Sequence, residues 1–98
     1  MWNQNYFTYI TTNPRKTVLY VGVTNDLERR LTEHYDNRGL PETFAGKYYC
    51  YNLLYYERHL KMIHAIEREK EIKLMSREDK EKLIKVENPA MLFLKIRN

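Results

Sequence analysis

Residues 19–34 decide the fold of this chain, and they read LYVGVTNDLERRLTEH. The first part of this stretch is rich in aromatic and β-branched residues, which favour a strand. Asn25 can then cap a helix, and Glu28, three residues later, can complete a capping box. Leu27 and Leu31 recur at i and i+4, which is the spacing of an apolar stripe on a helix. The stretch therefore predicts a strand that passes directly into a helix.

Two further strands are expected beside this one. Residues 6–11 have the same aromatic and β-branched character as residues 18–23. The segment between them contains Asn13-Pro14, which favours a turn, so the two segments are predicted to form an antiparallel hairpin. Residues 47–56 read KYYCYNLLYY. Because this third segment is apolar on both faces, it is predicted to be the central strand of the sheet.

Helical patterns dominate the second half of the chain. Residues 59–74 have apolar side chains at helical spacing. Ser76 can cap a further helix, which Asn88-Pro89 ends because the residue before a proline disfavours helical backbone. Residues 36–46 contain two glycines and a proline and are expected to form a long loop. The short apolar tail after the last helix is compatible with either a strand or a helix.

The length and composition fit a single small domain. The chain has 98 residues, and we predict one α/β (α+β) domain over residues 1–98, with a small, mainly antiparallel three-stranded sheet flanked by helices. The formal net charge of +4 is compatible with a nucleic-acid partner. The single cysteine rules out an internal disulfide, and a reducing, cytoplasmic compartment is expected. No apolar run approaches the roughly 20 residues of a membrane span, and the first five residues lack the segments of a signal peptide.

Five polar side chains are expected to meet on one face of the predicted sheet. Tyr9 and Tyr20 come from the two strands of the hairpin, Arg30 and His34 from the following helix, and Glu67 from the later helix. This set has the chemistry that phosphodiester hydrolysis requires. A carboxylate can hold one divalent cation, an arginine can bind phosphate, and a phenol of lowered pKa can accept a proton from water. The sequence does not decide which tyrosine takes the proton.

Three glutamates of the later helix compete for the role of metal ligand. Glu67 is favoured because it lies next to Ile66 and one turn past Ile63, at the expected edge of the apolar stripe. Glu69 and Glu71 are expected to form solvated ion pairs, which contribute little to stability. The prediction therefore depends on which side of this helix faces the sheet.

The same segments resemble the GIY-YIG nuclease family. Residues 7–10 and 19–34 are similar to the two tyrosine motifs of that family and to the helix that follows them, and residues 65–73 are similar to its glutamate helix. The first motif departs from the family pattern at its first two positions, although its tyrosine is retained. The chain is most similar to small stand-alone bacterial members, and it also resembles the GIY-YIG domains of excision-repair nucleases and homing endonucleases.

The resemblance implies a metal-dependent endonuclease that hydrolyses phosphodiester bonds of DNA, with RNA as the alternative substrate. It also implies a role in DNA repair or recombination. It implies one divalent cation, Mg²⁺ or Mn²⁺, held by Glu67. The implied roles are catalysis by Tyr9, Tyr20, Arg30 and His34, and support of the site by Asn88. Gly22, Arg29 and Lys70 are further expected to bind substrate. A monomer is expected, and because relatives usually carry a separate targeting domain, a targeting protein partner is expected too.

Two other functions remain open from the sequence. The chain could be a nucleic-acid-binding module that keeps the fold and the basic surface without useful catalysis. It could also be a protein-interaction domain whose tyrosine-rich face docks a partner, since it contains nine tyrosines. Nucleic-acid binding that weakens steeply with salt would favour the first alternative, because phosphate contacts release counterions.

Overall fold

The first strand of the chain lies at the centre of a three-stranded sheet. In the computed structural model, which describes residues 5–96, β1 (Tyr6–Thr12) pairs antiparallel with β2 (Leu19–Thr24) on one side and with β3 (Asn52–His59) on the other. The predicted hairpin and the predicted antiparallel sheet are therefore confirmed. The two ends of the predicted domain, residues 1–4 and 97–98, lie outside the described residues.

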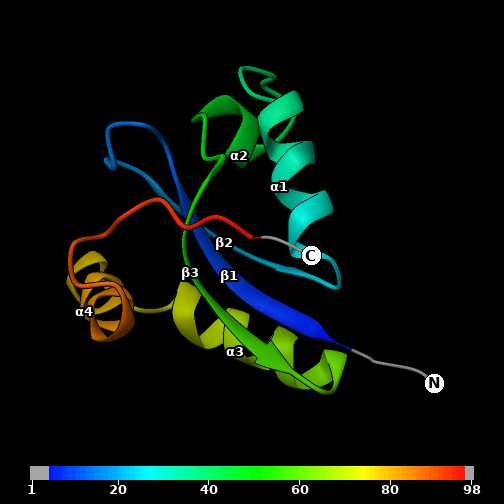
Figure 1. Ribbon diagram of the computed structural model, residues 1–98, viewed down its shortest axis with the longest axis vertical. Coiled ribbons are helices and arrows are strands. Elements are labelled where there is room, and N and C mark those ends of the chain that lie inside the picture. The colour runs from blue at the N-terminus through cyan, green and yellow to red at the C-terminus, as the bar shows by residue number, and fades with distance from the viewer. Residues whose placement is uncertain (1–4, 97–98) are drawn as a thin grey trace.

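Helices cover both faces of this sheet. They are α1 (Leu27–Asp36), α2 (Phe44–Lys47), α3 (Met62–Lys73) and α4 (Arg77–Glu87). In Figure 1, α1 and α2 lie on one side of the sheet, and α3 and α4 lie on the other. The predicted α+β class is confirmed by this arrangement. Among residues 5–96, no helix combines the length and the apolar character needed to cross a membrane.

Each face of the sheet has its own buried core, because successive side chains of a strand point to opposite faces. The core beneath α3 and α4 is mainly aliphatic and contains Ile10, Val21, Leu54, Tyr55, Ile72 and Ile84. The core beneath α1 is built around an aromatic ring and contains Tyr9, Leu27 and Leu53, with Phe7, Tyr20 and Leu31 among the residues packed against them. Tyr9 and Ile10 are neighbours in β1, so one residue of the central strand serves each core.

The third strand differs from the prediction in position and in limits. β3 is an edge strand and not the central strand, because β1 pairs on both sides. It begins at Asn52, because the first residues of the predicted strand instead end α2. Lys47 is the last residue of α2, Tyr48 is its C-cap, and Tyr49 N donates to Gly46 O at 3.2 Å. The tyrosines made this run appear buried on both faces. However, Tyr49 and Tyr56 are exposed, and Tyr49 has a positive φ of 59°.

Capping side chains set the beginnings of α1 and α4. The hydroxyl of Ser76 accepts a hydrogen bond from a backbone N–H of the first turn of α4, as predicted. In α1 the cap is Asp26 and not Asn25, because Arg29 N donates to Asp26 Oδ1 at 3.0 Å. A carboxylate at this position is also stabilised by the positive end of the helix dipole.

The tail after α4 is fixed to β3 by a buried asparagine. Asn88 Nδ2 donates to the carbonyl oxygens of Leu54 and Leu92, both at 2.9 Å, and Asn88 Oδ1 accepts from Leu92 N at 3.0 Å. Further along the tail, Leu94 N donates to Leu53 O at 2.8 Å and forms an isolated β-bridge. The tail is therefore mostly irregular. Asn88 connects the end of α4 to the sheet, and the partners of its side chain in these three hydrogen bonds are all backbone groups.

Candidate active site

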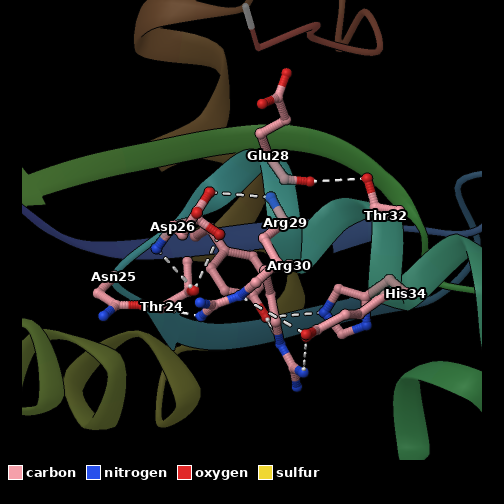
Figure 2. A network of polar contacts seen from close by, with 10 residues as sticks. Thr24, Asn25, Asp26, Glu28, Arg29, Arg30, Thr32 and His34 are labelled. Atoms are coloured by element: carbon pink, nitrogen blue, oxygen red, sulfur yellow. Dashed lines mark hydrogen bonds and ion pairs between the residues drawn. The ribbon is translucent and has the colours of Figure 1, made fainter. Parts of the chain in front are cut away.

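A buried phenol lies at the centre of the cluster between the sheet and α1. Tyr9 belongs to the central strand, and none of its surface is exposed. Its hydroxyl is 2.8 Å from His34 Nε2 and accepts a hydrogen bond from Arg30 Nε at 3.3 Å. Figure 2 shows Arg30 and His34 on α1 with these contacts as dashed lines. Hydrogen bonds therefore join three of the four residues that were predicted to be catalytic, and the fourth, Tyr20, lies beside them.

The local sequence of α1 explains why Arg30 and His34 converge on Tyr9. Residues four apart lie on the same side of a helix, about one turn from each other. Leu27 is buried and Leu31 is packed against the core beneath α1, so the side that carries these leucines faces the sheet. Arg30 and His34 lie beside that apolar stripe. They approach β1 at the border of the core, where Arg30 remains partly exposed and His34 is buried.

Tyr20 completes an aromatic cluster around His34. Its ring centroid lies 5.4 Å from that of His34, in an edge-on arrangement, and 6.2 Å from that of Tyr9. On its other side it stacks against Phe44 of α2, with an interplanar angle of 23°. Tyr20 is half-buried, whereas Tyr9 is fully enclosed. The two tyrosines are therefore adjacent but differ in their access to a substrate.

Gly22 provides the space that the Tyr9 ring occupies. It pairs directly with Tyr9 across the hairpin, and a Cβ atom at this position would lie 2.5 Å from Tyr9 Oη and 2.6 Å from Tyr9 Cζ. Such distances are far below van der Waals contact, so any side chain here would displace the phenol. A glycine inside a strand often marks close approach by another group. Here that group is Tyr9, so Gly22 shapes the site, and it is itself buried.

Burial and charge fix the protonation of this cluster. Burial lowers the pKa of His34 to about 4, and the nearby Arg30 cation acts in the same direction, so the imidazole is neutral at pH 7. Burial raises the pKa of Tyr9 well above its ordinary value, although the hydrogen bond from Arg30 opposes this shift. Since Arg30 can only donate, the Tyr9 oxygen accepts from it. The hydroxyl hydrogen of Tyr9 can then be donated to His34 Nε2, which favours the tautomer with hydrogen on Nδ1.

Glu67 does not lie where the prediction placed it. The side of α3 that faces the sheet carries Ala65 and Ile72, which have no exposed surface, and Ala65 O accepts a hydrogen bond from Thr8 Oγ1. Each residue turns a helix by about 100°, so Glu67 is about 160° away from Ala65 and points to the opposite side. Glu67 and Lys70 are both exposed there. The placement was wrong because it took Ile63, which is exposed, as part of the buried stripe.

Glu69 is the acidic residue of α3 that lies beside its buried face. It is four residues after Ala65 and three before Ile72, so both are within about 60° of it around the helix. Its side chain is 20% exposed, and its Oε2 is 3.3 Å from Lys73 Nζ. Lys73 in turn lines an open cleft of about 320 Å³ at the edge of the sheet, together with Tyr20. The spacing from Ala65 and Ile72 is the sequence signal that would have identified Glu69.

Two other predicted residues lie at the periphery. Arg29 is exposed, donates from Nη2 to Asn25 Oδ1 at 3.0 Å, and forms an ion pair with Glu33 at 3.7 Å. It borders a second open cleft of about 320 Å³, which Arg30 also lines. Asn88 is buried at the outer edge of the sheet, where its side-chain amide donates to Leu54 O of the edge strand β3. It therefore supports the fold, and the described contacts give it no place beside the tyrosines.

Comparison with known proteins shows the family to which the chain belongs. A family model described as the GIY-YIG catalytic domain matches residues 5–83. Because this match covers most of the chain, the protein belongs to the GIY-YIG family, and a nuclease-type domain that acts on nucleic acid is indicated. The solution NMR structure of a UPF0213 protein from Bacillus halodurans is similar, with a TM-score of 0.52, 25% sequence identity, and 86% of each chain covered. No curated protein matches the chain.

Proposed function

We propose that this chain is a divalent-metal-dependent nuclease that hydrolyses phosphodiester bonds of DNA. The observation that carries the proposal is the position of Arg30. Its side chain is 36% exposed, yet its guanidinium is held by Tyr9 from one side and by Glu33, at 3.0 Å, from another. A guanidinium that is oriented but accessible is suited to binding phosphate through two parallel hydrogen bonds, and to stabilising the charge that develops there.

In this proposal the two tyrosines have different roles. Tyr9 is enclosed and its pKa is raised by burial, so it keeps its proton and positions Arg30 through their hydrogen bond. Neutral His34 holds the Tyr9 hydroxyl from the opposite side. Tyr20 is half-buried and lines the open cleft, so it is the phenol that orients the attacking water and takes up its proton.

Glu69 is the residue that would hold the metal ion. Among the described residues, no group of three or more histidine, cysteine or acidic side chains could form a complete metal site. One carboxylate is nevertheless enough for Mg²⁺ or Mn²⁺ when substrate phosphate and water provide the remaining ligands. A bound cation would supply charge neutralisation on the phosphate and a lower pKa for water. Lys73, which is paired with Glu69, would then be released to contact phosphate.

A matched pair of substitutions tests this assignment. Glu69→Gln should lower the rate of DNA cleavage in Mg²⁺ by at least about 100-fold, since a neutral amide is a much weaker ligand. Glu67→Gln, two residues away on the exposed side of the same helix, should keep the rate within about twofold. Both are measured on the full chain with single-stranded, duplex and branched DNA and with RNA, with and without chelator. A large loss in the Glu67 variant and none in the Glu69 variant would overturn the choice of ligand.

The same assays separate the nuclease from a module that only binds. Chelator-sensitive cleavage that Arg30→Ala abolishes would support the nuclease. Salt-dependent binding without cleavage of any of these substrates would favour the binding module.

We also propose that the protein is a monomer guided by a targeting protein and that it acts in DNA repair or recombination. Size-exclusion chromatography and the survival of source cells lacking the gene after DNA damage test these points.

A further inference from the structure

The cleft beside Tyr20 contains residues that the proposed reaction does not use. It lies at the free edge of β2, which is an outer strand of the sheet, and has a volume of about 320 Å³. Its lining combines aliphatic, aromatic and cationic side chains: Leu19, Tyr20, Val21, Phe44, Lys73 and Lys80. Phe44 and Lys80 have no role in positioning Arg30 or in holding a metal ion, so their presence beside Tyr20 requires another explanation.

Phe44 presents an aromatic ring to solvent next to the proposed active site. It begins the short helix α2, and 51% of the residue is exposed. One side of its ring stacks on Tyr20, while the ring of Tyr48 lies at a centroid distance of 4.7 Å. The Lys47 ammonium is 5.3 Å from the centroid of the Tyr48 ring. An exposed aromatic surface of this kind, bordered by cations, is what single nucleobases stack on in nucleic-acid-binding proteins.

We propose that Phe44 is a stacking platform for one unpaired nucleobase of the substrate, and that Lys73 and Lys80 bind the phosphate next to that base. The proposal rests on the proposed function, because it specifies which form of nucleic acid reaches Tyr20 and Arg30. In a continuous duplex both faces of a base are covered by its neighbours, so only an unpaired nucleotide offers a free face to Phe44. The cleft therefore selects substrates with an unpaired nucleotide beside the cleaved bond, and it does so with little dependence on base identity.

Lysine is suited to the phosphate side of this cleft. Lys73 and Lys80 come from α3 and α4, and both line the cleft together with Phe44. A lysine ammonium binds phosphate as a mobile point charge, whereas Arg30 provides the oriented pair of donors at the reacting group. The two kinds of cation would thus bind different phosphates of the substrate. The lysines would bind the neighbouring phosphate, and the arginine would bind the phosphate that is cleaved.

Binding without catalysis tests the stacking role directly. The full chain is titrated in chelator against a fluorescein-labelled single strand of about 12 nucleotides and against a duplex of the same length, and anisotropy is recorded. Phe44→Ala and Phe44→Leu should each weaken single-strand binding by at least about fivefold, because neither side chain offers a π-face. Duplex affinity should change by less than about twofold. Far-UV circular dichroism checks that each variant is folded.

Matched controls exist for both halves of the cleft. Phe93, also exposed at 41%, lies in the tail and does not line the cleft, so Phe93→Ala should leave both affinities unchanged. Lys80→Ala should reduce the slope of log affinity against log salt by about 1, whereas Lys82→Ala, on the same helix outside the cleft, should not. Equal losses on single strand and duplex, or restored binding in Phe44→Leu, would overturn the stacking role.

Cleavage measured in parallel separates this inference from the proposed nuclease. If no substrate is cleaved but Phe44→Ala still loses single-strand affinity selectively, the stacking site stands and the nuclease proposal fails. If single strands are cleaved and Phe44→Ala changes neither their affinity nor their rate, the nuclease stands and the stacking site is wrong. Selective loss of both affinity and rate on substrates with unpaired nucleotides supports both proposals.

Discussion

The two faces of the sheet bury neighbouring residues of β1 for different purposes. Ile10 and Tyr9 are adjacent, and neither has any exposed surface. Ile10 packs among aliphatic side chains beneath α3 and α4, where burial is the main source of stability. Tyr9 is buried beneath α1, but its hydroxyl is joined to His34 and to Arg30, which leads to the surface. Apolar burial is non-directional, whereas hydrogen bonds require defined geometry, so the packing around Ile10 mainly stabilises the fold, whereas the hydrogen bonds of Tyr9 hold Arg30 and His34 in position.

The largest expected effect is a loss of stability on the aliphatic face. Ile72→Ala removes a fully buried side chain from the core beneath α3 and α4, and should lower the free energy of unfolding by about 2–5 kcal/mol. Urea denaturation measures this change. Cleavage per folded molecule, measured without urea at a temperature where the variant is native, should stay within about twofold of wild type. A variant that keeps its stability but has lost its rate would show that this core also positions the groups that react.

Arg30→Ala should have the opposite profile, with a large effect on rate and a small effect on stability. Loss of an oriented donor at the phosphate should lower the cleavage rate by about 100-fold or more, which corresponds to about 2.7 kcal/mol. The partly exposed side chain contributes little burial, so the free energy of unfolding should change by less than about 1 kcal/mol. Single-turnover cleavage and urea denaturation are measured on the same preparation.

Arg30→Lys refines this result. Lysine keeps the charge but lacks Nε and the planar pair of donors, so the contact with Tyr9 Oη is lost. The rate should therefore remain well below wild type. Full recovery in the lysine variant would show that charge alone is needed, and that the geometry imposed by the Tyr9 face is unimportant.

Gly22→Ala should affect both properties, because it inserts a methyl group between the two tyrosines. The added Cβ would lie 2.5 Å from Tyr9 Oη and 3.0 Å from Tyr20 Cε2. Overpacking of this kind costs about 1–3 kcal/mol, and movement of the phenol should also lower the cleavage rate. Thermal denaturation and cleavage assays measure the two effects. In a Tyr9→Leu background the stability cost of Gly22→Ala should shrink, since the clashing ring is gone; an undiminished cost would locate the strain elsewhere.

The α1 face was more predictable from the sequence than the other one. Tyr9, Arg30 and His34 were placed together because strand alternation and the i, i+4 spacing of a helix are local rules, and α1 follows its strand directly. Glu67 was misplaced because the buried face of α3 depends on what packs against it. The small residue Ala65 faces the sheet, while the larger Ile63 does not.

The order of the strands and the role of Asn88 could not be predicted from local sequence patterns either. The tyrosine-rich residues 47–56 are as apolar as a central strand, but strand order is decided by pairing between distant segments. Asn88 was expected to support the site on the basis of a resemblance. Its hydrogen bonds join the backbone of β3, at Leu54, to that of the tail, at Leu92. No sequence pattern specifies these contacts, which give Asn88 a structural role at the edge of β3.

Lowering the pH should reduce the free energy of unfolding through His34, and this is the smallest of the expected effects. Burial, reinforced by Arg30, lowers the pKa of His34 to about 4 in the folded protein, whereas an unfolded histidine has a pKa of about 6.5. Between these values the unfolded chain binds more protons than the folded one, so stability is complete above about pH 6.5 and falls as the pH decreases toward 4. The loss should reach about 2 kcal/mol at pH 5, because each pH unit below the pKa of the unfolded histidine costs up to about 1.4 kcal/mol. Denaturation of wild type and His34→Leu at several pH values isolates this contribution. As the pH falls from 6.5 toward 4, the free energy of unfolding of wild type should decrease relative to that of His34→Leu. A difference in free energy that does not depend on pH would show that the contacts around Tyr9 do not hold His34 neutral.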